Sequence, residues 1–502
     1  TPAAPQPGSP APGGGSGGSG GNAPGGSVGG GQPSGGNAGG NGGGNASGNG
    51  GGGSSHPGIV HAPDVPVATG SQDIVGFVLE NTGTSAQAAG VVSFGQVFVS
   101  GDVMPGARLV AVIGGVEIPV QMDVKALNAD GSVRHAILSL NAPAIAAGGS
   151  VEMMLKEAAA APAGAALTAQ DAIAHGLNVT LDVNLHNADG STTMKSFSAA
   201  SLLSNAIAQN KVETWMSGTQ ASEFRVEATV ATGLKAVFDI RVMADGNIHT
   251  DVILANDSTF TPGINSFTYD VAIKQGAAVV YSEANMFHHA NSTWHQDAWL
   301  KGESAINVQR DVDYLVRSGA VPALDTALGV SEAAIQADAS AIAAADTGPL
   351  GTALVTQSMP MTGGRADIGA TPEWYARYLV TQDARAYEVM LANADAAGSV
   401  PWHYTDEATG NAVRVDQHPG LWIDYRGVGA GSIPDLGTAA DYAGWSPDTA
   451  HNPALSYLPY LFTGSHYYLD EMQAQAAWTV ATRDPVYTLA PGVLLPSSEQ
   501  LR

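Results

Sequence analysis

Residues 107–124 read ARLVAVIGGVEIPVQMDV, two apolar runs on either side of Gly114-Gly115. Apolar and other residues alternate strictly in the second run, VEIPV at 116–120. A period of two on either side of a glycine pair is typical of a β-hairpin. Turn signals such as NADG and further apolar runs, VVSFGQVFVSG and SVRHAILSL, extend the pattern over about residues 73–156. This part of the chain is therefore predicted to be a β domain.

A stretch of small residues, AAAAPAGAALTAQ, separates this domain from a second β region between about residues 172 and 310. Five runs in it are predicted strands, in the order LNVTLDVNL, EFRVEATVA, KAVFDIRVM, HTDVILAND and SFTYDVAI. Regularly spaced strands with polar turns are typical of an antiparallel β-sandwich.

Beyond about Pro322 the pattern changes to helix. SEAAIQADASAIAAAD at 331–346 begins with a serine cap and continues with strong helix formers. Thr371-Pro372 predicts the start of a helix through EWYARYLVTQDARAYEVMLANAD. PALSYLPYLFTG and SHYYLDEMQAQAAWTVATRD predict a helical hairpin broken at Gly464. No strand alternation is expected after this point.

Composition excludes several classes of function. The chain has no cysteine, so a disulfide scaffold, a thiolate metal site and a cysteine nucleophile are excluded. Its net charge of -25 argues against nucleic acid as a partner, because phosphate binding needs a surface rich in lysine and arginine. No run of about 18 apolar residues occurs, so no membrane span is predicted.

The first 55 residues hold 25 of the 64 glycines and no charged side chain. Such a segment cannot bury enough apolar surface to offset its chain entropy, so residues 1–70 are expected to be a flexible tether. Tethers of this kind commonly hold exported domains away from a cell surface. We therefore expect an extracellular or cell-surface bacterial protein, whose TPAAPQPG start resembles a trimmed terminus. Self-assembly through the glycine tract is the alternative.

Segments in all three regions resemble, in their order, the exo-rhamnogalacturonan lyase/YetA-like family. They are FGQVF (94–98), IPVQ (118–121), DGSVRHAILSL (130–140), the strands between Gly218 and Asn256, HHANSTWHQDAWLKG (288–302), GGRADIG (363–369), AHNPALSYLPYLFTG (450–464) and HYYLDEM (466–472).

The resemblance implies a multidomain β plus α fold. A RIFT-like β-barrel is expected at 71–165, a central antiparallel β-sandwich at 166–320 and a C-terminal (α/α) toroid at 321–502. A closed ring needs about 10–12 helices, while roughly 170 residues supply about half that number. An incomplete toroid, with the chain cut at Arg502, is therefore expected.

The family likeness also implies an exported polysaccharide lyase that cleaves a uronate-containing, acidic polysaccharide by β-elimination. That reaction needs a group that neutralises the C6 carboxylate, a base for the C5 proton and an acid for the leaving oxygen. No cofactor is expected; a structural calcium ion is conceivable but not indicated. The alternative function is a non-catalytic glycan-binding or fibre-forming surface protein on the same scaffold.

Residues 374–468 contain 19 of the 45 aromatic and histidine residues in the chain. That density suits a groove that stacks on sugar rings, although helices packed on helices also bury aromatic side chains. Trp374 and Trp422 are candidate stacking platforms, with core packing as the alternative. His451 and Asn452 precede a proline at a helix start and are candidates to orient a sugar, with a plain N-cap as the alternative.

Catalytic candidates come from the same segment. Arg365, next to Gly364, is the candidate carboxylate neutraliser, because arginine binds carboxylates with two hydrogen bonds; a structural arginine that ties its loop is the alternative. His403 and Tyr404 form one candidate base and acid pair, and His418 and Tyr425 form a second. Structural corners are the alternative for both pairs, and the carboxylates Asp406, Glu407 and Asp424 leave hydrolysis open.

A second histidine cluster precedes Lys301. Three histidines fall within eight positions at 288–295, but HHxxxxxH is not a zinc-ligand spacing, so no metal site is predicted. A sandwich loop over the groove is expected to bring His289 and His295 to the substrate. The loops at 363–452 are expected to converge around one open depression.

Overall fold

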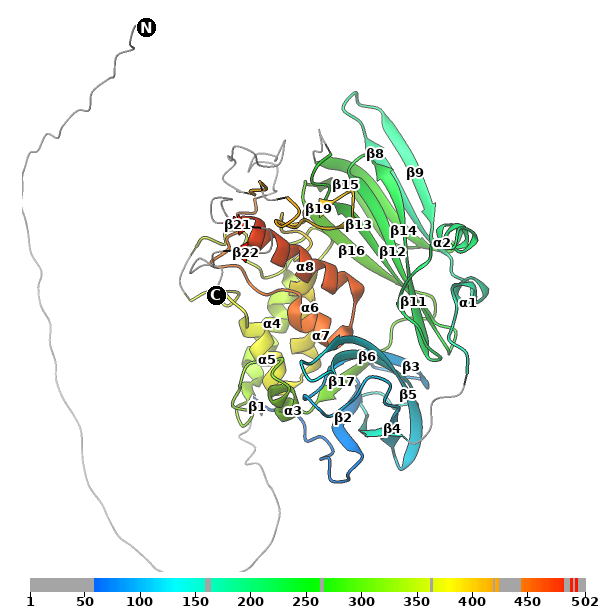
Figure 1. The fold of residues 1–502 in the computed structure, drawn as a ribbon, viewed down its shortest axis with the longest axis vertical. Helices are drawn as coiled ribbons and strands as arrows, with labels where there is room; N and C mark the ends of the chain where they lie inside the picture. Colours follow the sequence, from blue (N-terminus) through cyan, green and yellow to red (C-terminus); the bar gives the residue numbers. More distant parts are fainter. Residues whose placement is uncertain are drawn as a thin grey trace, which may run out of the picture. The chain divides into compact units, whose positions relative to one another are not determined.

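The computed structural model describes residues 58–158, 164–261, 266–361, 364–418, 420–423, 444–482, 488–490 and 493–494. Residues 55–502 form one compact unit, which contains two β-rich parts and a group of helices (Figure 1). Residues 1–57 of the predicted tether, Asp424 and Tyr425 lie outside the described residues. No helix in the described ranges is long and apolar enough to cross a bilayer.

The first β domain is a seven-stranded antiparallel sheet that nearly closes into a barrel, in the order β17-β2-β7-β4-β5-β6-β3. Its strands are β2 Asp73–Asn81, β3 Gly90–Val97, β4 Leu109–Ile113, β5 Val116–Leu127, β6 Val133–Ala142, β7 Ser150–Glu157 and β17 Ile306–Arg310. The predicted hairpin is confirmed as β4 and β5. Gly114 and Gly115 have φ values of 58° and 82°, and such left-handed angles at both turn residues favour glycine. Strand β17 joins this sheet from the far end of the expected sandwich segment.

Two further sheets pack face to face and confirm an antiparallel, sandwich-like arrangement. One has the order β15-β14-β8-β9 and the other β10-β11-β12-β13-β16. Their strands are β8 Val179–His186, β9 Thr192–Ser198, β10 Glu213–Met216, β11 Ala221–Ala231, β12 Leu234–Met243, β13 Ile248–Asn256, β14 Phe267–Gln275, β15 Ala278–His288 and β16 Ser292–Trp299. Apolar side chains from both sheets, including Leu181, Phe238 and Trp294, form the core between them. Two short helices, α1 Ala169–Ala174 and α2 Ala199–Ala208, pack against this core.

The remaining helices are α3 Val312–Arg317, α4 Glu332–Ala344, α5 Glu373–Thr381, α6 Ala384–Asp395, α7 Tyr457–Thr463 and α8 His466–Ala481. Helix α6 packs on α4 and α5, and α7 packs on α8. The predicted cap at Ser331 and break at Gly464 are confirmed. Within the described residues these helices form adjacent pairs, and no closed ring is shown.

Two helix-region predictions are wrong in detail. The single helix expected after Pro372 breaks at Gln382, which has a φ of 52° and a fully buried side chain. Its side-chain oxygen accepts the backbone N–H of Arg310 at 3.0 Å, so contact with β17 fixes the break. Short strand pairs also occur beyond Pro322: β18 Val330–Ser331 with β1 Ile59–Val60, β19 Thr405–Asp406 with β20 Asn411–Ala412, and β21 Thr488–Ala490 with β22 Val493–Leu494.

Arg310 joins the barrel-like sheet to the helices. Its side chain, only 3% exposed, donates to the carbonyls of Val308 at 2.8 Å, Gly95 at 3.1 Å and Phe462 at 3.0 Å. A Cβ atom at Gly95 would lie 2.2 Å from the carbonyl oxygen of Leu461, so glycine lets α7 pack directly on β3. The Arg310 hydrogen bonds and the close approach of α7 to β3 therefore fix the junction between the barrel-like sheet and the helices.

Candidate functional site

A cavity of about 500 Å³ lies where the barrel-like sheet, the five-stranded sheet and the helices meet. Strand β3 and the segment leading into β17 form one side, strands β11, β12, β13 and β16 form another, and helices α5 to α8 contribute the rest. Cavities between packed domains are a common location for small-molecule and sugar sites. This junction cavity is lined by charged and aromatic side chains together, which suits a polar ligand with an apolar ring face.

The cavity side of the five-stranded sheet carries two rows of polar side chains. Residues directly opposite one another on neighbouring strands form these rows, which are Glu223, Arg241, His249 and Trp299 in the first, and Arg225, Asp239, Asp251 and Asp297 in the second. Side chains alternate between faces along a strand, so the adjacent residues Phe224, Phe238 and Val252 enter the sandwich core. Because side chains alternate along each strand, all eight side chains of the two rows lie on the cavity side of the sheet.

Most of these charges are paired. Arg225 donates two hydrogen bonds to Asp239, at 2.7 and 2.6 Å, and its remaining nitrogen lies 2.7 Å from Asp470 of α8. The Nε atom of Arg241 lies 2.5 Å from Glu223. Burial raises the pKa of Asp239, but the charge of Arg225 outweighs it and holds that pKa below its ordinary value.

Two histidines of this face form ion pairs with aspartates. His249 lies 2.5 Å from Asp297, and His295 lies 2.9 Å from Asp251 and 3.0 Å from Asp395. Burial lowers the pKa of each imidazole, but the neighbouring carboxylates outweigh it and raise the pKa of both. Both rings therefore favour the protonated form, as a proton donor requires.

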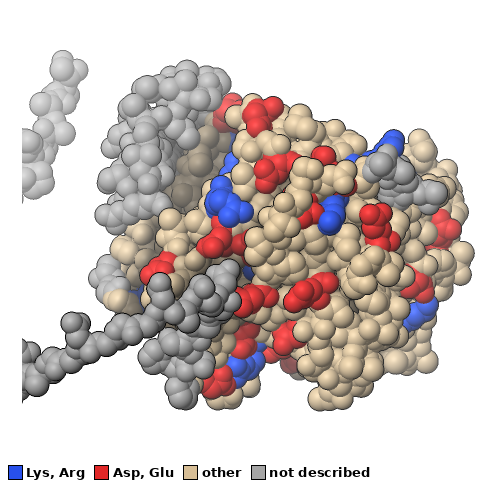
Figure 2. Space-filling model, turned by 90° about the horizontal axis from the view of Figure 1, so that it is seen from below, with Lys and Arg blue, Asp and Glu red and all other residues tan. Residues whose placement is uncertain are grey.

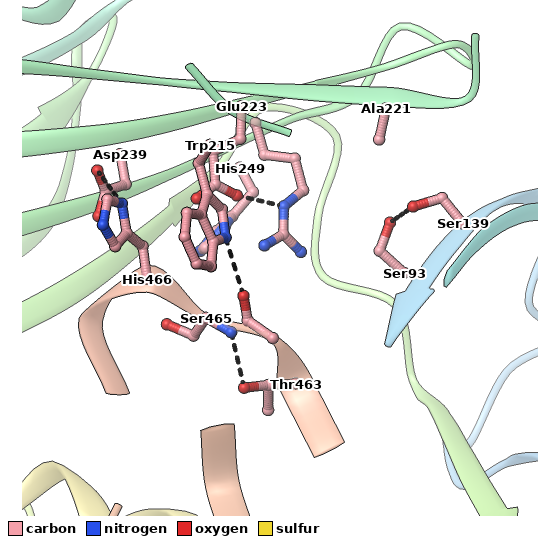
Figure 3. A network of polar contacts seen from close by, with 12 residues as sticks. Ser93, Ser139, Trp215, Ala221, Glu223, Asp239, His249, Thr463, Ser465 and His466 are labelled. Atoms are coloured by element: carbon pink, nitrogen blue, oxygen red, sulfur yellow. Dashed lines mark hydrogen bonds and ion pairs between the residues drawn. The ribbon is translucent and has the colours of Figure 1, made fainter. Parts of the chain in front are cut away.

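His466, the first residue of α8, differs from these histidines. Its ring stacks on Trp215 with centroids 4.4 Å apart, and Trp215 is held by a bond from its Nε1 to the Gly464 carbonyl at 3.1 Å (Figure 3). Its Nδ1 forms a long ion pair with Asp239 at 3.9 Å, drawn as a dashed line in Figure 3, and its Nε2 forms another with Asp470 at 3.9 Å; both distances are too long for a hydrogen bond. Among the residues that the structure describes, no group accepts or donates a hydrogen bond at this ring.

Two groups of side chains have the composition of metal ligands. Glu223, Asp239 and His466 form one, and Asp251, His295 and Asp297 form the other, with ligand atoms within 4.8 Å of one another in each group. In the second group both aspartates are already paired with histidines, and in the first both carboxylates are paired with arginines. Each carboxylate of the two groups therefore already has a basic side chain as its partner.

Of the residues predicted from sequence, His295 alone lines the cavity within the described part of the chain. Arg365, His451 and Asn452 lie together elsewhere. The Arg365 guanidinium donates to the carbonyls of His451 at 2.8 Å and Ser358 at 3.2 Å, and the Asn452 carbonyl accepts from Gly369. These contacts tie two loops to each other.

His403, Tyr404 and Trp374 are buried in the core of the helical region, with exposures of 4%, 3% and 5%. His403 is held by Glu471, at 2.7 Å, and His289 is 1% exposed with its Nδ1 3.2 Å from the Ala290 carbonyl. These positions are closed to a polymer, so the expected single open depression is not formed by them.

His418 and Trp422 lie near the surface of the helical region. His418 bonds to Asp406 at 2.9 Å and packs its ring 4.5 Å from that of Phe260. Trp422 donates from its indole to the Thr482 carbonyl at 3.1 Å. Tyr425, the expected partner of His418, is outside the described residues.

Sequence reasoning assigned the strands of the charged sheet face but not the face itself. The signal is charged or polar residues at every second position in EFRVE (223–227), FDIR (238–241), HTD (249–251) and HQD (295–297). In EFRVE and FDIR the charged residues alternate with apolar ones that fill the core, and such a face needs another element to cover it. His466 carries no comparable signal, because its contacts with Trp215 of β10 and Asp239 of β12 join segments that are distant in the sequence.

The outer surface is mixed in charge. On the face shown in Figure 2, basic side chains stand singly among more numerous acidic ones, with no broad basic patch in the described atoms. A comparison with models of known protein families gives no match, and a search of curated proteins gives none either.

Proposed function

We propose that this chain is an exported polysaccharide lyase that cleaves a uronate-containing glycan by β-elimination in the junction cavity. The observation that carries the proposal is the pair of differently held histidines: His466 has no hydrogen bond within the described residues, and His249 is held by Asp297 in an environment that favours its protonated form. An accepting and a donating imidazole in one cavity are what elimination needs. The resemblance to the exo-rhamnogalacturonan lyase/YetA-like family, with its RIFT-type barrel and helical toroid, belongs to the same proposal.

The reaction assigns one proton to each ring. His466 takes the C5 proton of the uronate, the C4–O bond breaks as the C4–C5 double bond forms, and His249 gives its proton to the leaving oxygen. The Nε2 atom of His249 bonds to Asp297, while its Nδ1 has no hydrogen-bond partner in the described ranges and remains to donate. Trp299 stacks on His249 with centroids 4.3 Å apart and offers an aromatic face to a sugar ring beside the reacting bond.

The test is incubation of the full chain with a panel of acidic polysaccharides and their neutral counterparts. Elimination creates an unsaturated uronate, so ultraviolet absorbance should rise together with the number of reducing ends. Reducing ends without that absorbance would identify a hydrolase instead. Glycan binding with no product of either kind would favour the second function, a non-catalytic glycan-binding surface protein.

A further inference from the structure

Arg241 and Arg225 lie on the same face of the same sheet, but their guanidinium groups are used differently. Arg225 has all three nitrogens in ion pairs, two to Asp239 and one to Asp470. Arg241 uses only Nε, which lies 2.5 Å from Glu223. Its two terminal amines have no hydrogen-bond partner anywhere in the described chain, although the residue is only 9% exposed.

The position of Arg241 makes these amines available to a ligand. Arg241 lines the junction cavity and lies directly opposite His249 on the neighbouring strand. Its partner Glu223 has a carboxylate oxygen within 4.8 Å of a ring nitrogen of His466. Arg241 therefore lies opposite His249 and is connected through Glu223 to the surroundings of His466, the two histidines that the proposed reaction uses.

The cavity also holds an arginine that no carboxylate balances. Arg310 donates only to neutral oxygens, namely three backbone carbonyls and the hydroxyl of Tyr378, among the described residues. A guanidinium in this setting makes the local potential more positive, although acidic residues outnumber basic ones in the chain as a whole. Glu303 and Glu388 also line the cavity, so Arg310 offsets part of its acidic charge.

We propose that the terminal amines of Arg241 form a subsite for the carboxylate of an acidic sugar. This inference rests on the proposed function and names its substrate class. Two parallel N–H groups match the two oxygens of a carboxylate, and Glu223 fixes the guanidinium so that this edge stays directed into the cavity. In the elimination, the same contact neutralises the C6 carboxylate and makes the C5 proton more acidic.

Binding of monosaccharides tests the subsite without requiring turnover. The full chain is titrated with galacturonate, galactose and galactose 6-sulfate, and binding is followed by calorimetry or ligand-observed NMR. We expect galacturonate to bind at least tenfold more tightly than galactose. Equal binding of these two sugars would overturn the inference, and tighter binding of the sulfate ester would overturn its assignment to a carboxylate.

Variants of Arg241 locate the effect. Arg241→Lys keeps the charge and a donor for Glu223 but loses the two-pronged edge, so galacturonate binding should fall about tenfold while galactose binding is unchanged. The double variant Glu223→Gln with Arg241→Gln removes the buried pair together, so that neither charge is left alone if the single variant folds poorly. Arg414→Gln, which removes an exposed arginine outside the cavity, should change nothing. Unaltered galacturonate preference in both Arg241 variants contradicts the subsite.

The two proposals fail in different ways. If galacturonate binds through Arg241 but no polysaccharide yields unsaturated product, the elimination is wrong and the carboxylate subsite stands. If unsaturated product forms at the same rate in Arg241→Lys as in the unmodified chain, the elimination stands and the subsite is wrong.

Discussion

The Nε2 atom of His403 lies 2.7 Å from the Oε2 atom of Glu471, and the two side chains are 5% and 1% exposed. The other oxygen of Glu471 accepts a bond from the hydroxyl of Thr293 at 2.6 Å, and Thr293 belongs to β16 of the sandwich. A single buried carboxylate on α8 thus connects the helical region to the charged sheet. A histidine that sequence reasoning offered as a catalytic base is held inside the protein as a link between its parts.

We expect His403→Ala to lower the free energy of unfolding by roughly 3–5 kcal/mol, because it leaves a buried carboxylate without its partner. The midpoint of urea or thermal unfolding measures the loss. His418→Ala breaks a histidine–aspartate pair whose histidine is 33% exposed, and it should cost only about 0–1 kcal/mol. Equal effects of the two substitutions would contradict the structural role of His403.

The turn between α7 and α8 requires glycine at position 464. Gly464 has a φ of 67°, and a Cβ atom there would lie 2.4 Å from Cγ1 of Ile137. Gly464→Ala should therefore cost roughly 2–4 kcal/mol, the sum of a left-handed residue and an overpacked contact. Gly410→Ala, at a φ of 71° with open space around it, isolates the backbone cost at about 1–2 kcal/mol. If both variants lost the same free energy of unfolding, a clash with Ile137 at position 464 would be ruled out.

The contribution of His288 and His289 to stability is expected to fall in mild acid, because both rings are buried in the neutral form and must charge when the chain unfolds. Burial lowers the pKa of His288 to about 3 and that of His289 to about 4, whereas both titrate near 6.5 in an unfolded chain. As the pH falls below about 6.5, these two rings bind protons in the unfolded state but not in the folded state, and their contribution is lost down to the folded pKa values. His249 and His295, whose pKa is raised, contribute in the opposite direction. His289→Gln should make this loss shallower between about pH 6.5 and pH 4. An unchanged slope in thermal unfolding over that range would argue against a neutral, buried His289.

Local sequence patterns predicted the strands and turns better than the site. The hairpin around Gly114-Gly115 and the helix end at Gly464 follow from short-range rules, because a left-handed glycine and an alternating run determine local structure by themselves. The break at Gln382 was not predicted, because it depends on Arg310, which is distant in the sequence.

The site was predicted less well for the same physical reason. Aromatic density drew attention to residues 374–468, but Trp374, Trp402 and Tyr404 are core residues, since large rings bury much apolar area when helices pack. The charged sheet face was present in the sequence as alternation, whereas its closeness to His466 and Arg310 arises only from packing between distant segments. His295 was found because histidine and tryptophan cluster around it at 288–299.

One assay distinguishes an active site in the junction cavity from one in the helical region. It measures the rise in ultraviolet absorbance when the full chain acts on a uronate polysaccharide. His466→Gln should lower the rate by about 100-fold or more with little change in glycan affinity, because it removes the proposed base and not a binding group. His186, at the end of β8, is paired with Asp270 and lies outside the cavity. His186→Gln should therefore leave the rate unchanged. A His466→Gln protein that stays folded and keeps the full rate would show that elimination does not take place in the junction cavity.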